Sequence, residues 1–262
     1  MTDELRPDAV REAFRRRRGH WNDDWEAMLG YSPAYVAAYL EFSAYVADRG
    51  TLTPKFRELV YVATNCTPTH MFEKGLRNHA RQALELGATP AELFSVVATV
   101  SAIGIYSYLL VAESVAALVP GAAGNADTAA VDRVKADHAA LFGTVMAGVA
   151  PGIELAGIEL DSDFYASWLN FAAAPIRGPR AALSVKDAHL IALAVHAQCT
   201  QLNAASVHQH AAAALAHGAS ADEVLDIGRL ISSMGIHAMV FALPVITDLA
   251  ARGDEHGDFP RL

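Results

Sequence analysis

The sequence predicts an all-α protein built from two tandem helical repeats, and three observations lead to this prediction. The chain aligns with itself without a gap over a long segment when it is shifted by 131 positions. Residues 52–55 (LTPK) then fall on 183–186 (LSVK), and residues 87–92 (GATPAE) fall on 218–223 (GASADE). Helix start signals recur in the same order in both copies, whereas the alternating patterns typical of strands are absent. The chain is also 53% hydrophobic, which is enough to build a sizeable shared core.

Residues 1–30 are predicted to form an N-terminal helical extension. Its helix ends just before Gly19 with residues 15–18 (RRRR), where cations complement the helix dipole. We interpret this basic run as a solvated helix end, with contact to an anion or to another subunit as the alternative.

The first repeat, residues 31–119, contains four predicted helices. Proline follows the capping residues Ser32 and Thr53, and this combination is typical of a helix start. Gly87 stops the third helix, and the capping box that begins at Thr89 opens the fourth. The predicted helices cover about residues 33–48, 54–65, 71–86 and 90–118. The fourth is long and apolar, so we expect it to be buried on most sides.

A linker that contains a helix, residues 120–159, is predicted between the repeats. The linker opens on a segment rich in glycine and proline, which favours an irregular connection. Asn125 or Asp127 then caps a helix that runs to about Met146.

The second repeat, residues 160–252, follows the same plan and ends before a C-terminal tail at residues 253–262. Three of its helices are expected at about residues 184–199, 203–217 and from 220 onwards, the last again behind a capping box. The helix before these three, which contains residues 168–171, aligns with residues 39–42 of the first repeat at an offset of 129. The loop of the second copy around Gly178-Pro179 therefore differs in length from that of the first copy by two residues.

The charge and hydropathy of the chain limit the kinds of partner that it is expected to have. A net charge of −9 and a pI of about 5.6 argue against a nucleic-acid-binding surface. Residues 1–19 lack the apolar core of a signal sequence, and the apolar residues 96–119 are interrupted by polar side chains. We therefore predict a soluble, cytoplasmic protein whose partner is a small-molecule substrate, with neither nucleic acid nor a membrane as a partner.

Cys66 and Cys199 are the two cysteines, and they are far apart in the sequence. They provide neither a disulfide framework nor a zinc motif. We expect both to behave as small buried hydrophobic residues.

Residues 73–84 (EKGLRNHARQAL) resemble the carboxymuconolactone decarboxylase family, and residues 55–59 (KFREL) look like the family's usual entry to the same unit. Residues 210–223 (HAAAALAHGASADE) are similar again. The resemblance covers about residues 30–118 and 160–250 and implies two units of the family's helical fold. Because family members are typically trimers or hexamers of single units, it also implies a homo-oligomer, either a dimer or a trimer of the tandem chain.

The family has two well-known activities, which can be tested against the residues. One branch decarboxylates a carboxymuconolactone in aromatic ring-cleavage catabolism, and the other resembles alkylhydroperoxidase D, a thiol peroxidase with a Cys-x-x-Cys-x-x-x-His motif. Counted back from the histidines, the cysteine positions hold Phe72 and Gly75 in the first copy and Asn203 and Ser206 in the second. Because a dithiol peroxidase needs an attacking and a resolving thiol, the sequence argues against peroxidase chemistry.

The first copy provides a candidate acid/base site. The resemblance places His79 at the family's catalytic histidine, which makes it the candidate general acid or base. Glu58 or Glu73 is its candidate partner for orientation or proton relay. Arg77 is the candidate anchor for a substrate carboxylate. The alternative is that Glu73 and Arg77 form a solvated pair one helical turn apart and that His79 is structural.

The second copy is richer in histidine, and His189 and His210 are its candidate acid/base pair. His189 stands in register with Glu58, and His210 stands in register with His79. Further candidates for substrate binding are His196, Asn203, Ser206, His208, Tyr106 and His237. A metal site is disfavoured because no His-x-x-x-His pair and no acidic ligand at metal spacing accompany these residues. The alternative is that these histidines satisfy polar groups in the core.

We predict a cofactor-independent acid/base enzyme, a carbon–carbon lyase that acts on a small carboxylated or lactone substrate in aromatic catabolism, without a metal. A peroxidase-related oxidoreductase and a non-catalytic small-molecule-binding or assembly protein are the alternatives. The different residues in the two copies lead to the hypothesis that one copy is active and the other is structural.

Overall fold

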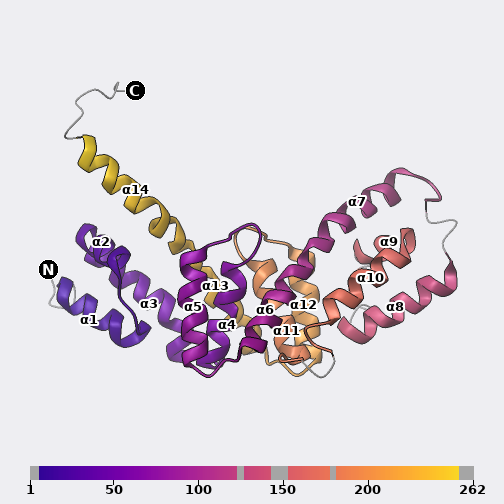
Figure 1. Cartoon of the computed structure of the whole chain (residues 1–262), viewed down its shortest axis with the longest axis horizontal. Helices are drawn as coiled ribbons and strands as arrows, with labels where there is room; N and C mark the ends of the chain where they lie inside the picture. Colours follow the sequence, from indigo (N-terminus) through magenta and orange to yellow (C-terminus); the bar gives the residue numbers. More distant parts are fainter. Residues whose placement is uncertain (1–5, 123–126, 143–152, 178–180, 254–262) are drawn as a thin grey trace. The chain divides into compact units, whose positions relative to one another are not determined.

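The structure is a computed structural model that describes residues 6–122, 127–142, 153–177 and 181–253. These residues form helices joined by short turns (Figure 1), which confirms the predicted all-α class. The chain divides into two compact units, one formed by Met1–Gly50 with Ser232–Leu262 and the other by Thr51–Ile231. The units cut across the repeats, because the first helix of repeat one and the last helix of repeat two belong to the same unit.

The smaller unit packs around the aromatic side chain of Phe14. Its helices are α1 (Pro7–Arg18), α2 (Asp23–Tyr31), α3 (Pro33–Arg49), the 3₁₀ turn η4 (Ser233–Ile236) and α14 (His237–Gly253). The Phe14 ring is fully buried and lies 4.4 Å from the ring of Trp25. Helix α1 ends at Gly19, which has a φ of 74°. In the preceding basic run, Arg17 forms ion pairs with Glu41 and Asp48 of α3, so this arginine ties two helices together.

The larger unit contains the remaining helices of both repeats and the linker. Those helices are α4 (Pro54–Asn65), α5 (Glu73–Glu85), α6 (Pro90–Ser101), η2 (Ala102–Gly104), α7 (Ile105–Leu118), α8 (Thr128–Phe142), α9 (Ile153–Leu160), α10 (Ser162–Ala173), α11 (Val185–Ala197), α12 (Ala204–Ala216) and α13 (Ala221–Ser232). Helix α4 packs against α5, α11 packs against α12, and α4 and α11 contact each other. Asp127 caps α8, whereas Asn125, Met146 and Gly178-Pro179 lie outside the described residues.

The backbone of the two repeats matches in detail. Met71 and Leu202, which are 131 positions apart, are both left-handed, with φ angles of 45° and 44°. This conformation stops the chain from continuing as a helix, so α5 begins at Glu73 and not at Met71. The two glycine stops match as well, with φ angles of 85° at Gly87 and 93° at Gly218.

The two repeats meet through equivalent residues within the larger unit. The hydroxyl of Thr69 donates to the hydroxyl of Thr200 over 3.1 Å, and these two residues are 131 positions apart. The equivalent helices α4 and α11 also contact each other.

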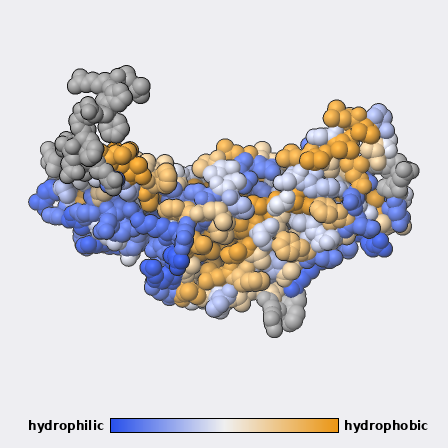
Figure 2. Space-filling model, turned by 45° about the horizontal axis from the view of Figure 1, so that its top comes forward, coloured by the Kyte–Doolittle hydropathy of each residue, from blue (hydrophilic) through white to orange (hydrophobic). Residues whose placement is uncertain are grey.

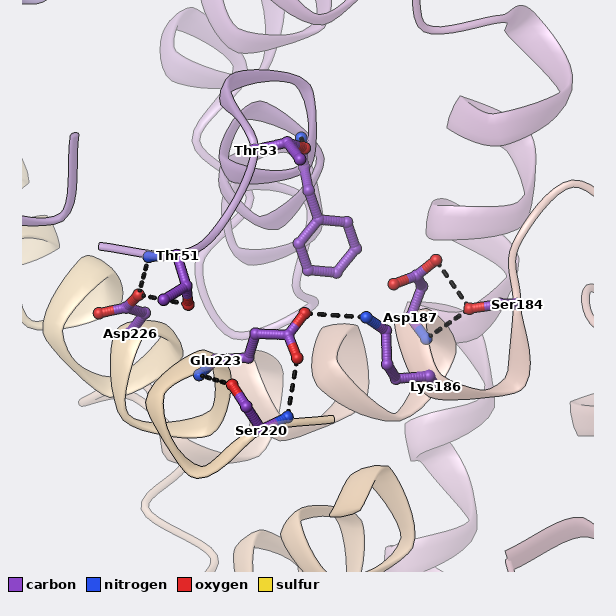
Figure 3. A network of polar contacts seen from close by, with 9 residues as sticks. Thr51, Thr53, Ser184, Lys186, Asp187, Ser220, Glu223 and Asp226 are labelled. Atoms are coloured by element: carbon purple, nitrogen blue, oxygen red, sulfur yellow. Dashed lines mark hydrogen bonds and ion pairs between the residues drawn. The ribbon is translucent and has the colours of Figure 1, made fainter. Parts of the chain in front are cut away.

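Polar contacts hold the second and fourth helices of each repeat together, and those of the second repeat are drawn in Figure 3. Lys186 Nζ lies 2.8 Å from Glu223, which also completes the capping box with Ser220, and the first repeat has the matching pair Lys55–Glu92 at 2.7 Å. In the first repeat, Ser95 stands at the position equivalent to Asp226. The fully buried carboxylate of Asp226 accepts from the Thr51 backbone over 2.6 Å and from Arg229 over 2.9 Å.

The fourth predicted helix of the first repeat is broken, and its expected burial is wrong. The 3₁₀ turn η2 separates α6 from α7, and η4 stands at the matching place in the second repeat. Many apolar side chains of α7 face solvent, including Leu110, Val111 and Leu118, at exposed fractions of 59%, 61% and 80%. Figure 2 shows apolar side chains (orange) at the surface of the molecule.

Two helical stretches, Pro90–Leu118 and Ala221–Ala250, are long and apolar enough to cross a membrane, and 28% and 33% of their most apolar windows are buried. Length and composition alone do not separate a membrane span from a helix of a soluble protein. The expectation that no membrane is a partner therefore stays a prediction.

Candidate active site

Glu58 and His79 form a hydrogen-bonded pair between α4 and α5. His79 Nδ1 lies 2.7 Å from Glu58 Oε2, and the side chains are only 10% and 14% exposed. The ring of Tyr61 stacks on the imidazole with 4.4 Å between ring centroids. Because a carboxylate can only accept, His79 donates from Nδ1, and Nε2 remains the ring nitrogen that can act on a substrate.

Glu73 and Arg77 pair with each other and not with His79. Arg77 lies 2.6 Å from the Glu73 carboxylate, and the two side chains are 74% and 71% exposed. They lie on the solvent side of α5, whereas His79 lies on its buried side. The structure therefore selects Glu58 over Glu73 as the partner of His79, and it places the candidate carboxylate anchor away from this pair.

In the first repeat, the space beside one of the two cysteine positions of the peroxidase motif, Gly75, is occupied by neighbouring side chains. A Cβ atom on Gly75 would lie 2.3 Å from Asn65 Oδ1 and 2.6 Å from the Phe72 ring. Asn65 is fully buried and donates to the Tyr61 carbonyl, so it cannot move easily. A cysteine at position 75 would therefore have no space for its side chain.

Replacing Gly75 by alanine is expected to lower the free energy of unfolding by about 1–3 kcal/mol, because it overpacks this contact. The matched control is Gly228→Ala in α13, where a Cβ meets nothing within 4 Å. Alanine there should raise stability by about 0.5–1 kcal/mol, since it is the better helix former. Urea unfolding of both variants measures the two shifts, and a stabilising effect at position 75 would contradict the packing argument.

The second repeat has a cavity beside its own histidine. The cavity has a volume of about 50 Å³ and lies where residues of α6, η2, α7, α8, α10, α11 and α12 meet. Its polar lining includes Thr99, Tyr106, His189, His196 and His210, and its apolar lining includes Ile103 and Trp168. Thr99, Ile103 and Tyr106 belong to the first repeat in sequence, so the first repeat helps to build the site of the second.

His189 and His210 take the places of Glu58 and His79 in this site. His189 Nε2 donates to the Leu141 carbonyl over 3.3 Å, because a carbonyl can only accept. In the neutral ring, His189 Nδ1 is then an acceptor, and it lies 3.2 Å from His210 Nδ1, which donates to it. Nε2 of His210 consequently carries a lone pair, so His210 has the same tautomer that the carboxylate imposes on His79.

Burial keeps the histidines of the second site neutral near pH 7. Burial lowers the pKa of His189 and of His196 to about 4. The pKa of His210 is also well below its usual value because of burial and then the neighbouring histidines. The two sites therefore differ in charge: the first contains a carboxylate, whereas the second is a set of neutral rings.

His138 of the linker helix α8 is a member of this cluster that the sequence did not reveal. It is 1% exposed, its Nδ1 lies 2.7 Å from the Tyr165 hydroxyl, and burial lowers its pKa to about 4. Among the described residues, no group of three His, Cys, Asp or Glu side chains could hold a metal ion.

Several predicted substrate-binding residues of the second repeat have other positions or roles. His208 is exposed, and Asn203 caps α12 by accepting from the Ser206 backbone over 3.2 Å. Ser206 is buried, but the hydrogen bond to His210 that its spacing allows is not formed. His237 is partly buried at the start of α14, in the other compact unit.

The cysteines differ from each other. Cys66 is partly buried, and burial raises the pKa of its thiol to about 11, which disfavours the reactive thiolate. Cys199 is exposed, so the expectation that it is buried is wrong.

The fold and the two centres define an all-α tandem-repeat protein with one oriented histidine in each repeat. The model of the carboxymuconolactone decarboxylase family matches residues 33–118 and 162–248, and the chain belongs to this family. A solved structure described as a "putative gamma-carboxymuconolactone decarboxylase subunit", from Burkholderia xenovorans LB400, has the same fold, with a TM-score of 0.82. It is 24% identical, and the alignment covers 95% of this chain and 98% of that one. No match was found among curated proteins.

Proposed function

We propose that this protein is a cofactor-independent acid/base enzyme that acts on a small carboxylated or lactone substrate, with its reaction centre at Glu58 and His79. The observation that carries the proposal is the 2.7 Å contact between these side chains in a largely buried setting. The family membership supports a decarboxylase-like reaction, and a role in the catabolism of aromatic compounds in the cytoplasm is part of the proposal.

In the proposed reaction, the bond between the substrate carboxylate and its neighbouring carbon breaks and carbon dioxide leaves. The electron pair of this bond moves into an enolate next to the lactone carbonyl. The imidazolium form of His79 then donates the proton on Nε2 to that carbon, and solvent restores the proton. Glu58 acts as a positioning residue that holds Nδ1–H and stabilises the positive charge of the protonated ring.

The experiment is a measurement of carbon dioxide release on a panel of carboxylated lactones and keto acids, with carboxymuconolactone included. The proposal expects turnover without added metal or cofactor, and it expects the same rate in Cys66→Ser and Cys199→Ser. Reduction of a peroxide by a dithiol that either cysteine variant abolishes would favour the peroxidase alternative. Absence of turnover, together with saturable binding of panel members, would favour a binding protein.

The proposed assembly is a homo-oligomer, a dimer or trimer of the tandem chain, in which a second copy covers exposed apolar residues of α7. Patches of this kind are uncommon on monomers. Sedimentation equilibrium should therefore give two or three times the chain mass of 27.9 kDa. The double variant Leu110→Lys, Val111→Lys should weaken this association, whereas a monomeric wild-type chain would contradict the proposal.

A further inference from the structure

The cavity of the second repeat differs from the first centre in the kind of polar group it presents. No Lys, Arg, Asp or Glu lies among the described residues that line it. A carboxylate that entered would lose its hydration and gain no charged partner, which is unfavourable in a buried site. The cavity is therefore unsuited to the carboxylated end of a substrate.

One buried polar atom beside the cavity has no hydrogen-bond partner among the described residues. It is Nδ1 of His196, which lines the cavity and is 2% exposed. Buried polar groups in native proteins are nearly always paired, so an unpartnered one beside a cavity points to a bound molecule that pairs with it.

The histidine rings also fix the direction of the hydrogen bonds. His210 stacks on His196 with 5.3 Å between ring centroids and 7° between planes, and the Tyr106 ring meets His196 edge-on at 4.7 Å. The contacts through His189 to the Leu141 carbonyl make Nε2 of His210 an acceptor. A ligand that meets this nitrogen must therefore bring a hydrogen-bond donor, as a hydroxyl group does.

Taking up a proton is disfavoured here, in contrast to the first centre. A protonated His210 would be a buried cation among other histidines, and no carboxylate lies opposite it in the place that Glu58 occupies beside His79. The second centre can hold a hydroxyl group but lacks the charge that would stabilise proton transfer from it.

We propose that the second repeat is a non-catalytic binding site for a small uncharged molecule that carries a hydroxyl group on an apolar body. The hydroxyl lies in the cavity beside the stacked rings of His196 and His210, and the apolar body lies toward Ile103 and Trp168. The space of about 50 Å³ exceeds the roughly 10–15 Å³ that one water molecule needs in a cavity. The cavity thus has room for a hydroxyl and the atoms next to it, and the body must extend toward the opening.

The test uses phenol as the probe, with anisole and benzoate as matched controls, in calorimetric titrations of the full chain at pH 7. Phenol should bind saturably, anisole should bind at least tenfold more weakly because it lacks the donor, and benzoate should not bind. His196→Phe should weaken phenol binding at least tenfold. Tyr106→Phe, which alters the lining with a smaller change of shape, is the second variant if His196→Phe fails to fold.

The control variant is His79→Gln, which should leave phenol binding unchanged while the decarboxylation rate falls. This control separates the second site from the proposed reaction centre. Equal binding of benzoate and phenol, absence of phenol binding, or unchanged binding in a folded His196→Phe protein would overturn the proposal.

Discussion

Replacing Glu58 by glutamine is expected to lower the turnover number of the proposed decarboxylation by roughly 10²–10⁴-fold, the range typical of lost acid/base assistance. The amide keeps the size of the side chain but removes the negative charge that lies 2.7 Å from His79 Nδ1. The protonated imidazole then loses its counter-charge during proton transfer. Steady-state kinetics measures the loss, which should fall on kcat more than on KM.

The matched control for this variant is His189→Gln, the equivalent position in the second repeat. It should leave the turnover number within a factor of about ten, a change of about 1.4 kcal/mol in the barrier. Nitrogen NMR of the imidazole should also show that the preference of His79 for a proton on Nδ1 weakens in Glu58→Gln. An unchanged rate in Glu58→Gln, with substrate still turned over, would show that the pair is structural.

The second large effect is a loss of stability in mild acid that arises from the buried histidines. Burial lowers the pKa of His138, His189 and His196 to about 4 in the folded chain, against about 6.5 in an unfolded chain. Between these values the unfolded state binds more protons, so stability is present above pH 6.5 and is lost as the pH falls toward 4. Each of these histidines contributes on the order of 3 kcal/mol to that loss, since one pKa unit corresponds to about 1.4 kcal/mol.

Thermal unfolding measured from pH 7.5 to pH 4 tests this expectation. The shifts of all three histidines act in the same direction, so the melting temperature should fall in this range. His196→Phe removes one titrating group whose Nδ1 has no partner among the described residues, and it should make the fall shallower. A melting temperature that stays constant down to pH 4.5 would contradict the neutral, buried state of the cluster.

The repeat allowed the central pairs to be predicted from the sequence. Glu58 and His79 belong to consecutive helices, as do His189 and His210, and a tight turn between such helices brings them together. The positive φ angles at Met71 and Leu202 make that turn the same in both copies. The register of 131 positions then showed which residue replaces Glu58, so the difference in charge between the sites could be anticipated.

Other parts of the site depend on tertiary packing that the sequence pattern does not encode. His138 lies in a linker helix outside both repeats, and only the packing of α8 brings it to the cluster. The spacing of Glu73 and Arg77 fits a binding site and a solvated pair equally well. The high exposure of both side chains in the structure favours the solvated pair. The 3₁₀ turn at Ala102–Gly104 breaks a helix whose apolar sequence carries no stop signal other than one glycine.

The most direct test of the division of work between the repeats compares His79→Gln with His210→Gln on the same substrate. The two histidines are equivalent in the repeat, and they differ in whether a carboxylate or a neutral ring lies beside Nδ1. We predict that His79→Gln loses at least 10²-fold in turnover number, whereas His210→Gln, if folded, stays within about tenfold of the wild type. Equal losses in the two folded variants would contradict the account.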